Sequence, residues 1–326
     1  MKNDIIGLDL NKDSLPKLIV MCGLQCSGKS TKAKELASRY KAEIISSDQL
    51  RLDHPDYDNQ AIFKLLYSRV NNLLSINKNI VIDATNTTIK MRKQIFNNVK
   101  QACYKMCYIM NTPYEECLNR LNIRNNSFYP HKVPEEVLKK YYYSFEVPFY
   151  EEGWNEIIID KSFSFYDSFI NSNKLRLLTF GFNQNNRHHT QDLGSHMDSV
   201  GSNLSKYSNQ LLTDSGYMHD IGKLFTQTYK ENDPNAHYYN HANVGAYVML
   251  CNFSYWEMKD HFSTAEYDMN KTLDFIFYIN YHMHLYNIKS DKSEKKWRQI
   301  FGDNKYNNLI MLNEADKANH VEDKNE

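Results

Sequence analysis

Cysteine is scarce in this sequence, and the cysteines present are not spaced as pairs. There are six in 326 residues, and no two of them form a C-x-x-C motif. A chain of this length is also too long to depend on disulfides in place of a hydrophobic core. The sequence therefore excludes a small disulfide-stapled scaffold, and we expect reduced thiols and a cytoplasmic location.

Long apolar runs and an excess of one charge are also absent. No apolar stretch approaches the roughly 20 residues that span a bilayer, and residues 1–13 lack the basic and apolar regions of a signal peptide. Lysine plus arginine equal aspartate plus glutamate at 39 each, so net charge alone does not indicate a polyanion partner. The apolar share of 41% is typical of globular proteins. We expect no membrane association and a chain long enough for two domains.

A glycine-rich loop lies near the start of the chain. Residues 23–30 read G-L-Q-C-S-G-K-S, which has the form G-x-x-x-x-G-K-S. The apolar run 18–22 predicts a buried strand before it, and residues 31–40 predict a helix after it. In this context the motif binds phosphates through backbone amides and the helix N-terminus. We expect Lys29 to reach the outer phosphates of a nucleotide and Ser30 to hold Mg²⁺; the alternative is a chance glycine turn.

Further apolar segments predict strands that alternate with helices. The predicted strands are 18–22, 43–47, 79–83, 103–110 and 156–159. Such alternation indicates a parallel α/β sheet, in which ligands bind at the carboxyl ends of the strands. The glycine loop, Asp48 with Arg51, and the D-A-T-N segment 83–86 all follow strand ends, and Thr88 is expected to cap the next helix. These segments are therefore candidates for one shared site.

Asp48 has two interpretations. A carboxylate beyond a strand and facing the glycine loop can accept a proton from an attacking hydroxyl, whereas aspartate is also a common helix cap. Arg51, one helical turn further on, favours the catalytic role because a guanidinium suits an acceptor's phosphate. Asp83 ends an apolar strand as a Walker-B carboxylate does. A role near Mg²⁺, or in bracing the loop, is therefore favoured, and the alternative is an ordinary solvated turn.

Arg120 and Arg124 are four residues apart in a predicted helix over 116–125, so they share one face of it. In kinases of this architecture a mobile lid with arginines closes over the transferred phosphoryl group and neutralises its charge. The alternative is a solvated, charged helix face.

In chain order, the motifs G-x-x-x-x-G-K-S-T, D-x-x-R, D-A-T-N, R-x-x-x-R and V-P-x-x-V-L resemble the kinase domain of the polynucleotide kinase family, and most of all its phage and bacterial end-healing members. The resemblance covers about residues 17–160. It implies ATP and Mg²⁺ as cofactors, and the host cytoplasm as the location if a phage encodes the chain. Gln25 and Cys26 depart from the Pro-Gly more usual in the family, which should change the stiffness of the loop rather than its chemistry.

The same resemblance assigns roles to individual residues. It implies Asp48 as general base for a 5′-hydroxyl, Arg51 on the acceptor's 3′-side phosphate, and Arg124, with Arg120 nearby, on the nucleotide's phosphates. The predicted nucleotide-binding residues are Gly23, Ser27, Gly28, Lys29, Ser30, Thr31, Arg120 and Arg124, and the predicted substrate-binding residues are Arg51, Asp83 and Asn86.

Strand signals fade after residue 165, where we place a domain boundary. Periodic apolar positions in 204–218, 242–253 and 272–284 predict a helical domain. Ten of the twelve histidines lie in this half. Seven of them, with two carboxylates, form the ordered series His188, His189, His196, His219-Asp220, His241, His282, His284 and Asp316.

This set of side chains suits a metal site. Imidazoles and carboxylates without thiolates favour Mn²⁺, Co²⁺, Ni²⁺, Fe²⁺ or Mg²⁺. A lone histidine is more often a core or surface group than a ligand. An ordered series that contains adjacent His219 and Asp220 and a later Asp316 is much harder to explain in that way.

The pattern H…HD…D, with H-D-I-G-K at 219–223, resembles the HD phosphohydrolase superfamily. The phrase H-H-T-x-D-x-x-x-H also resembles the HD region of some tRNA-nucleotidyltransferases. The resemblance spans about residues 186–318 and implies an all-helical domain. It implies, as ligands of a divalent metal, His196, His219, Asp220 and Asp316.

Two further histidines stand where binuclear members of the superfamily carry ligands of a second metal. These are His241 in N-H-A-x-x-G-A and His282 in I-x-x-H-M; buried structural histidines are the rival interpretation. Lys223, one turn past His219-Asp220, would neutralise a substrate phosphate. His189 could orient or protonate the substrate.

The sequence thus predicts an α/β P-loop kinase domain with a lid over residues 1–165 and an all-α HD domain over 166–326. We expect a bifunctional end-healing enzyme that phosphorylates 5′-hydroxyl ends of RNA or DNA with ATP. Its second centre would remove a 3′-phosphate or 2′,3′-cyclic phosphate with metal-activated water, and a separate ligase is a candidate partner. The alternatives are a nucleoside or small-molecule kinase fused to an HD nucleotidase, a tRNA-processing phosphohydrolase, and a non-enzymatic nucleotide-gated binding module.

Overall fold

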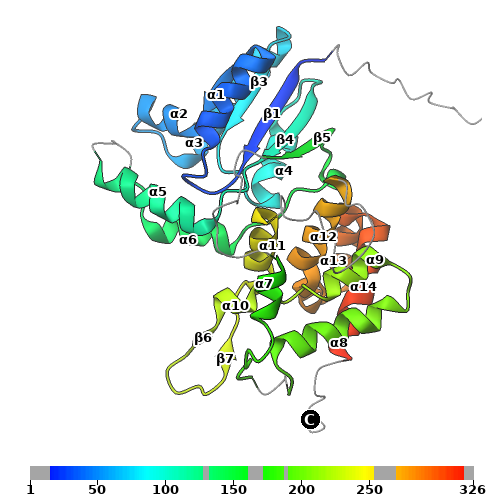
Figure 1. Ribbon diagram of the computed structural model, residues 1–326. Coiled ribbons are helices and arrows are strands. Elements are labelled where there is room, and N and C mark those ends of the chain that lie inside the picture. Colours follow the sequence, from blue (N-terminus) through cyan, green and yellow to red (C-terminus); the bar gives the residue numbers. More distant parts are fainter. Residues whose placement is uncertain (1–14, 128–131, 161–171, 187–189, 253–268, 319–326) are drawn as a thin grey trace, which may run out of the picture.

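The computed structural model describes the chain in segments (Figure 1), which are residues 15–127, 132–160, 172–186, 190–252 and 269–318. Residues up to 160 form a sheet with flanking helices, and the later ones are mostly helical. Within these segments, no helix combines the length and the apolar content that crossing a bilayer requires.

The sheet has the strand order β2-β3-β1-β4-β5, and its neighbouring strands are parallel. Every strand begins and ends within one residue of its prediction: β1 Lys17–Cys22, β2 Ala42–Ser46, β3 Asn79–Asp83, β4 Tyr104–Ile109 and β5 Glu156–Ile159. Aliphatic runs form such strands because their side chains pack on both faces of a covered parallel sheet. The predicted α/β sheet is confirmed.

Helices supply the cover on each face. Alternate residues of β1 belong to two apolar cores, with Val20 in one and Ile19 in the other. α3 and α4 contribute to the first core and α1 to the second. The helices and the short 3₁₀ turn of this region are α1 Lys29–Tyr40, α2 Ser47–Asp53, α3 Asn59–Ser75, α4 Ile89–Asn98, α5 Tyr114–Asn126, α6 Glu135–Tyr143 and η1 Tyr150–Glu152.

Thr88 begins α4 as predicted, because its Oγ1 accepts a hydrogen bond from the backbone N–H of Met91 at 3.3 Å. The predicted helix over 116–125 is α5, which projects with α6 to one side of the sheet (Figure 1). Residues 128–131, between these two helices, lie outside the described residues, so the predicted lid stays a prediction.

The region after residue 171 is rich in helix, but it is not purely helical. A short hairpin, β6 Thr228–Tyr229 with β7 Ala236–His237, interrupts it. The predicted helical stretch 204–218 spans parts of two helices, because Ser208 takes a left-handed conformation (φ 54°) and separates them. The remaining elements are α7 Ser172–Leu177, α8 Leu193–Ser205, α9 Gln210–Gly216, α10 Lys223–Thr226, α11 His241–Cys251, α12 Met269–Tyr281, η4 His282–Asn287, α13 Asp291–Phe301 and α14 Asp303–Lys317.

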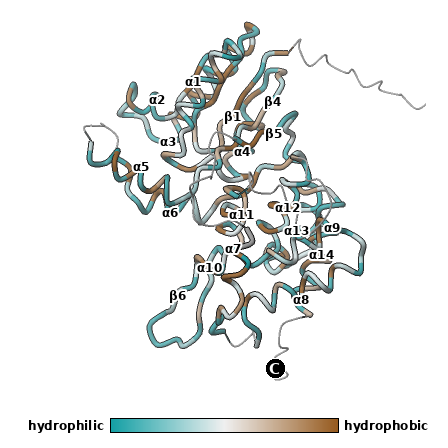
Figure 2. The backbone as a smooth tube through the Cα atoms, in the orientation of Figure 1, coloured by the Kyte–Doolittle hydropathy of each residue, from teal (hydrophilic) through white to brown (hydrophobic). Residues whose placement is uncertain are grey.

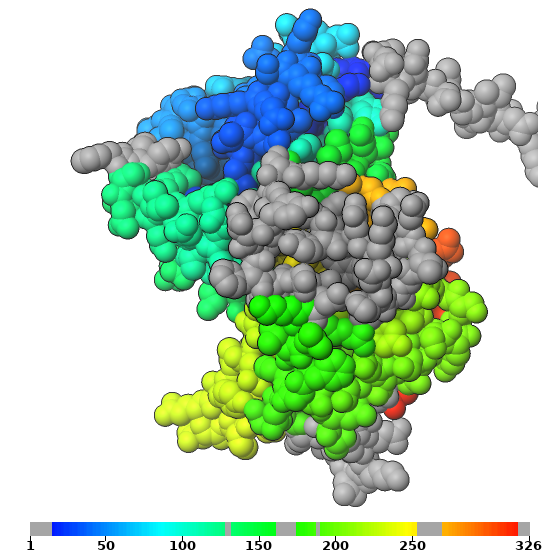
Figure 3. Space-filling view, viewed as in Figure 1, coloured from blue at the N-terminus to red at the C-terminus, as the bar shows by residue number. Residues whose placement is uncertain are grey.

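The two regions share one continuous apolar core rather than meeting at a polar seam. Hydrophobic segments run along the strands and along α11, which lies directly beneath the sheet region (Figures 1 and 2). The ring of Phe149 packs edge-on against Phe277 and Phe301, with centroid distances of 5.1 and 5.6 Å. In the space-filling view the sheet region and the helical region occupy opposite ends of the molecule (Figure 3). The predicted boundary at residue 165 falls outside the described residues.

Candidate active sites

The glycine loop joins β1 to α1 as predicted, and close packing explains its first glycine. A Cβ atom at Gly23 would lie 2.9 Å from the Cβ of Met110, so a side chain does not fit there. The Gly23 N–H donates to the carbonyl of Thr85 at 2.9 Å, which ties the loop to the end of β3. Gly28 has φ 92°, a conformation that other residues rarely adopt. The loop therefore brings the amides at the start of α1 to the carboxyl edge of the sheet.

Lys29 and Ser30, the first two residues of α1, meet Asp83 at this edge. The Ser30 hydroxyl donates to Asp83 Oδ2 at 2.7 Å. Hydroxyl and carboxylate oxygens are ligands that Mg²⁺ prefers, so this pair fits the predicted ion. Burial lowers the pKa of the Lys29 ammonium, while Asp83 opposes that shift. The Lys29 Nζ donates to the carbonyl of Leu24 inside the loop.

Asp48 does not cap α2, so the capping interpretation is wrong. The cap is Ser46, whose side chain accepts from the backbone N–H of Gln49 at 3.4 Å. The Asp48 carboxylate is 63% exposed and accepts a hydrogen bond from Arg51 Nη1 at 3.0 Å. Arg51 Nη2 also donates to Asn59 Oδ1 at 2.9 Å. Asp48 and Arg51 are thus paired with each other and accessible from the cleft described next.

One cleft of about 1420 Å³ contains most of the predicted kinase residues. Arg120 and Arg124 reach it from α5, opposite the glycine loop. Arg120 Nε donates to Glu116 Oε1 at 2.6 Å, and a Cβ at Gly28 would lie 3.7 Å from Arg120 Nη1. The predicted residues that line the cleft are Gly28, Lys29, Ser30, Thr31, Asp48, Arg51, Asp83, Asn86, Arg120 and Arg124.

Two predicted residues are held by the backbone around the cleft. Asn86 donates from its amide to the carbonyl of Met21 at 2.8 Å and adopts φ 48°, so its amide nitrogen braces the loop after β3. Ser27 is buried, and its carbonyl accepts from the Thr112 hydroxyl at 2.8 Å. Both therefore support the site through the loops that carry it.

Arg92 holds this region together, and the sequence reasoning missed it. Its fully buried guanidinium makes bonds of 2.7 and 2.6 Å to the two carboxylate oxygens of Glu152. It also donates to the carbonyls of Asn86, at 3.2 Å, and Glu146, at 2.8 Å. Burial acts to lower the pKa of Arg92, but Glu152 outweighs burial and raises it. A signal was present, since Arg92 stands three residues from both Ile89 and Ile95 on the apolar face of α4.

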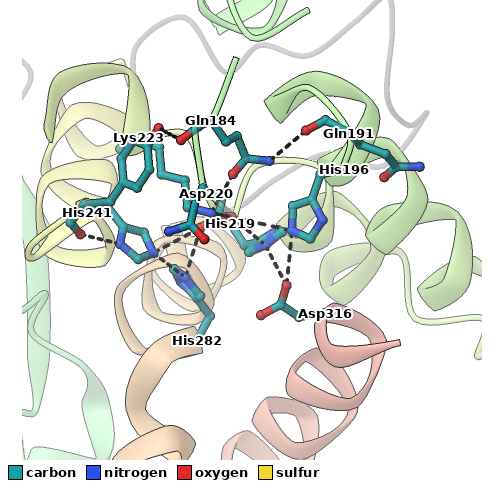
Figure 4. Close-up of polar contacts among 12 residues, drawn as sticks. Gln184, Gln191, His196, His219, Asp220, Lys223, His241, His282 and Asp316 are labelled. Atoms are coloured by element: carbon teal, nitrogen blue, oxygen red, sulfur yellow. Dashed lines mark hydrogen bonds and ion pairs between the residues drawn. The ribbon is translucent and has the colours of Figure 1, made fainter. Parts of the chain in front are cut away.

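The second predicted site brings together side chains from elements far apart in the sequence (Figure 4). His196 comes from α8, and His219 and Asp220 come from the turn after α9. All six predicted ligands are buried. The other three begin or lie within α11, η4 and α14, and they are His241, His282 and Asp316.

Gly222 explains how the turn and α11 come so close. A Cβ there would lie 1.9 Å from the carbonyl oxygen of His241 and 2.6 Å from the backbone nitrogen of Gly245. The glycine of H-D-I-G-K therefore lets the turn that carries Asp220 pack directly on the first turn of α11.

Asp220 lies between two groups of histidines. Its Oδ1 is 3.0 Å from His241 Nε2 and 3.4 Å from His282 Nε2. Its Oδ2 is 3.4 Å from His219 Nε2 and 3.5 Å from His196 Nε2. Asp220 thus belongs to two triads with metal-ligand spacing, His196-His219-Asp220 and Asp220-His241-His282.

Backbone hydrogen bonds fix the orientation of three of these imidazoles. The Nδ1 atoms of His219, His241 and His282 each lie 2.8 Å from the carbonyl oxygen three residues earlier. A ring that donates from Nδ1 presents the lone pair of Nε2, which is how metal-ligating histidines are usually held. The Nε2 atoms of His241 and His282 lie 3.0 Å apart. Two facing lone pairs at that distance fit a bound cation, so the donor set suits a divalent metal.

The charges of the centre agree with this arrangement. Burial opposes ionisation of Asp220, but Lys223 and His219 hold its pKa well below the usual range. Burial lowers the pKa of His196 and of His282, which keeps both neutral. For His219, Asp220 and Asp316 outweigh burial and raise the pKa to about 10. The carboxylates thus favour a positive charge at His219 Nε2, and a divalent metal would bind there in place of the proton.

Lys223 is more enclosed than the sequence suggested. It is buried, and its Nζ lies 2.7 Å from Asp220 Oδ2 and donates to Gln184 Oε1 at 2.9 Å. Tyr286, which the sequence reasoning also missed, donates from its hydroxyl to Asp316 Oδ2 at 3.0 Å. That bond leaves Asp316 Oδ1 facing His196 Nε2 at 3.1 Å. His189 lies outside the described residues.

Comparison with known proteins relates the first part of the chain to a family. A family model described as "AAA domain" matches residues 18–148. Protein KTI12 of Saccharomyces cerevisiae is 26% identical over an alignment of 155 residues, which covers 42% of this chain and 49% of that protein. The chain therefore spans about half the length of this curated relative.

The chain is also similar to several solved structures. One is a Pnkp1/Rnl/Hen1 RNA repair complex, which is 24% identical, with a TM-score of 0.37; the match covers 40% of this chain and 44% of that chain. A fungal RNA kinase has 16% identity, coverages of 51% and 83%, and a TM-score of 0.35. A gluconokinase from Sinorhizobium meliloti has 15% identity, coverages of 44% and 82%, and a TM-score of 0.32. The family match ends at residue 148, and residues 18–148 are a P-loop domain similar to the AAA domain of that match.

Proposed function

We propose that the chain is a bifunctional nucleic-acid end-healing enzyme. One centre would transfer the γ-phosphoryl group of ATP to a 5′-hydroxyl end, and the other would remove a 3′-phosphate or a 2′,3′-cyclic phosphate. The observation that carries this proposal is the cleft in which Asp48 and Arg51 line the same space as Lys29, Ser30 and Asp83. A nucleotide site and an acceptor site are needed there together for phosphoryl transfer.

In the kinase centre, Asp48 accepts the proton of the 5′-hydroxyl as that oxygen bonds to the γ-phosphorus. The bond from the γ-phosphorus to the bridging oxygen breaks, and ADP leaves. Lys29, Arg120 and Arg124 face the charge that spreads over the transferred group. Ser30 and Asp83 would hold Mg²⁺, which neutralises the phosphate charge when it is bound. Arg51 would bind a phosphate of the acceptor strand.

In the second centre, the two triads would hold divalent metal through imidazole Nε2 atoms and the shared carboxylate of Asp220. A metal held there would supply a hydroxide near neutral pH and would polarise the phosphoryl oxygen. The residues of the chain orient the ligands through the backbone carbonyls and keep the centre dry through burial. Lys223 contributes positive charge beside Asp220.

The decisive experiment uses RNA with a 5′-hydroxyl and a 2′,3′-cyclic phosphate, incubated with ATP, Mg²⁺ and Mn²⁺ and followed by analysis of both ends. We expect both ends to be healed, in a form that a separate ligase can seal. Lys29→Ala should abolish 5′ phosphorylation and leave 3′ processing, and Asp220→Ala should do the reverse. Loss of both activities in each variant would contradict two independent centres. Phosphorylation of free nucleosides or sugars alone would favour the small-molecule kinase.

A further inference from the structure

The kinase cleft extends past the phosphate-handling residues into a wedge between α3 and α4. The residues that line this wedge are Asn59, Gln60, Phe63, Lys64 and Tyr67 from α3 and its start, and Lys90, Met91, Gln94 and Asn98 from α4. None of them has a role in the proposed chemistry.

The helical spacing places the wedge residues of α3 on one side of that helix, and the wedge residues of α4 on one side of theirs. Phe63 and Tyr67 are four residues apart, and their ring centroids are 6.2 Å apart. Met91, Gln94 and Asn98 follow at intervals of three and four on α4. Residues at such intervals share one side of a helix. The α3 wall therefore presents aromatic rings, and the α4 wall presents a thioether and two amide groups.

The wedge is closed at one end and meets the acceptor residues at the other. At the closed end, the Asn71 amide donates to the carbonyl of Asn98 at 2.8 Å and accepts from the Lys100 N–H at 2.8 Å. At the open end, the guanidinium of Arg51 lies over the Phe63 ring, 5.8 Å from its centroid. A group held in the wedge is thus next to the residue that is proposed to bind the acceptor's phosphate.

The charge of the wedge, and a whole cleft large enough for an acceptor beside a nucleotide, favour part of a polyanion over a small acid or sugar. Lys64 and Lys90 are exposed, and among the described residues that line the wedge none is acidic. The whole cleft, at about 1420 Å³, exceeds the roughly 300–1,000 Å³ of a typical small-molecule site. Cationic side chains beside aromatic faces are the combination that binds single-stranded nucleic acid by stacking.

We propose that this wedge binds a nucleobase of the acceptor strand, stacked between Tyr67 and Met91, with the amide of Gln94 at its edge. The inference rests on the proposed kinase function and adds a base-binding subsite to it. The base would be fixed by stacking, which tolerates any of the four bases. The enzyme would accordingly require a base at one position near the 5′ end while showing weak sequence preference there.

The test uses the unmodified protein and a series of 5′-hydroxyl oligonucleotides, each with one abasic residue at the first, second or third position. We expect the abasic residue to raise KM for phosphorylation about tenfold at one of these positions and to leave KM unchanged at the other two. A tenfold increase is the size of effect that loss of one stacked base produces. Equal KM values for all abasic acceptors and the intact strand would overturn the subsite. No phosphorylation of the intact strand would overturn the kinase proposal instead, so the two failures are distinct.

Variants locate the subsite. Tyr67→Ala should raise KM for the intact strand about tenfold and remove the penalty of the sensitive abasic acceptor, whereas Tyr67→Phe, which keeps the ring, should leave KM near that of the unmodified protein. Asn72→Ala, on α3 but not among the cleft-lining residues, is the matched control. The Kd for ATP checks that each variant is folded. If Tyr67→Ala keeps the full abasic penalty, the base does not stack on Tyr67 and the assignment is wrong.

Discussion

Tyr286 shows how much of the metal centre depends on a single hydrogen bond. Its hydroxyl holds one oxygen of Asp316, so that the other oxygen faces His196. Groups that orient a ligand usually contribute 10- to 100-fold to metal affinity. We expect Tyr286→Phe to weaken Mn²⁺ binding roughly tenfold, measured by titration calorimetry on the metal-stripped protein. Tyr207→Phe, an exposed tyrosine of the same region, should have no effect. Unchanged affinity in Tyr286→Phe would show that this hydrogen bond does not position Asp316 for metal binding.

Arg92 is the residue on which we expect the stability of the sheet region to depend most. Its removal leaves the Glu152 carboxylate buried without its cation. We expect Arg92→Met to lower the free energy of unfolding by about 3–5 kcal/mol, measured by urea denaturation. Adding Glu152→Gln should recover part of the loss, because the uncompensated charge is then gone. The partly exposed pair of Arg298 and Glu294 is the control, and Arg298→Met should cost at most about 1 kcal/mol. Similar losses in both variants would contradict the special role of Arg92.

Residues differ in how far the sequence reveals them. Ser30 and Asp83 could be placed together because each follows a strand and parallel strands end at one edge. Tyr286 could not, since no spacing connects it to Asp316, thirty residues later. A side chain that orients a metal ligand, without itself binding the metal, has no characteristic sequence motif.

At the scale of elements, the strands were predictable because each is one short apolar run in a covered sheet. The break between α8 and α9 was not, because the apolar period continues through it. Ser208 has φ 54°, and Asn209 then caps α9 by accepting from the Leu212 N–H at 3.2 Å. Periodicity reports which face is buried, but it does not report the local conformation that ends a helix.

The cap of α9 carries a prediction because this helix leads into the turn of His219 and Asp220. Asn209→Ala removes the cap and should lower the free energy of unfolding by about 1 kcal/mol, measured by urea denaturation. Ser208→Gly, at the neighbouring left-handed position, should leave stability unchanged or raise it, because glycine adopts this conformation without a steric penalty. A loss in Ser208→Gly as large as that in Asn209→Ala would contradict this account of the break.

At the scale of the whole molecule, hydrogen bonds join the sheet region to the helices of the second centre, and one of them comes from the segment between α6 and β5. Asn280 accepts a hydrogen bond from the Val147 N–H at 2.7 Å and stands two residues before His282. The Tyr247 hydroxyl donates to the carbonyl of Thr112 at 2.6 Å, and Thr112 in turn bonds the glycine loop through Ser27. The helices that carry the second triad are thus docked on the P-loop domain, which a division of the sequence by composition could not show.

This docking predicts that the two regions unfold together. Asn280→Ala leaves the Val147 N–H without its partner and should lower the stability of the whole molecule by about 1–3 kcal/mol. Asn308→Ala, which removes a bond to Tyr278 on the same helix but no bond to residues 15–160, is the control. Calorimetry should show a single transition for the unmodified protein, because unfolding either region exposes the aromatic cluster around Phe149. Mg²⁺ with ATP should raise that one midpoint. Two separate transitions, only one of them moved by the nucleotide, would mean that the regions are independent despite their shared core.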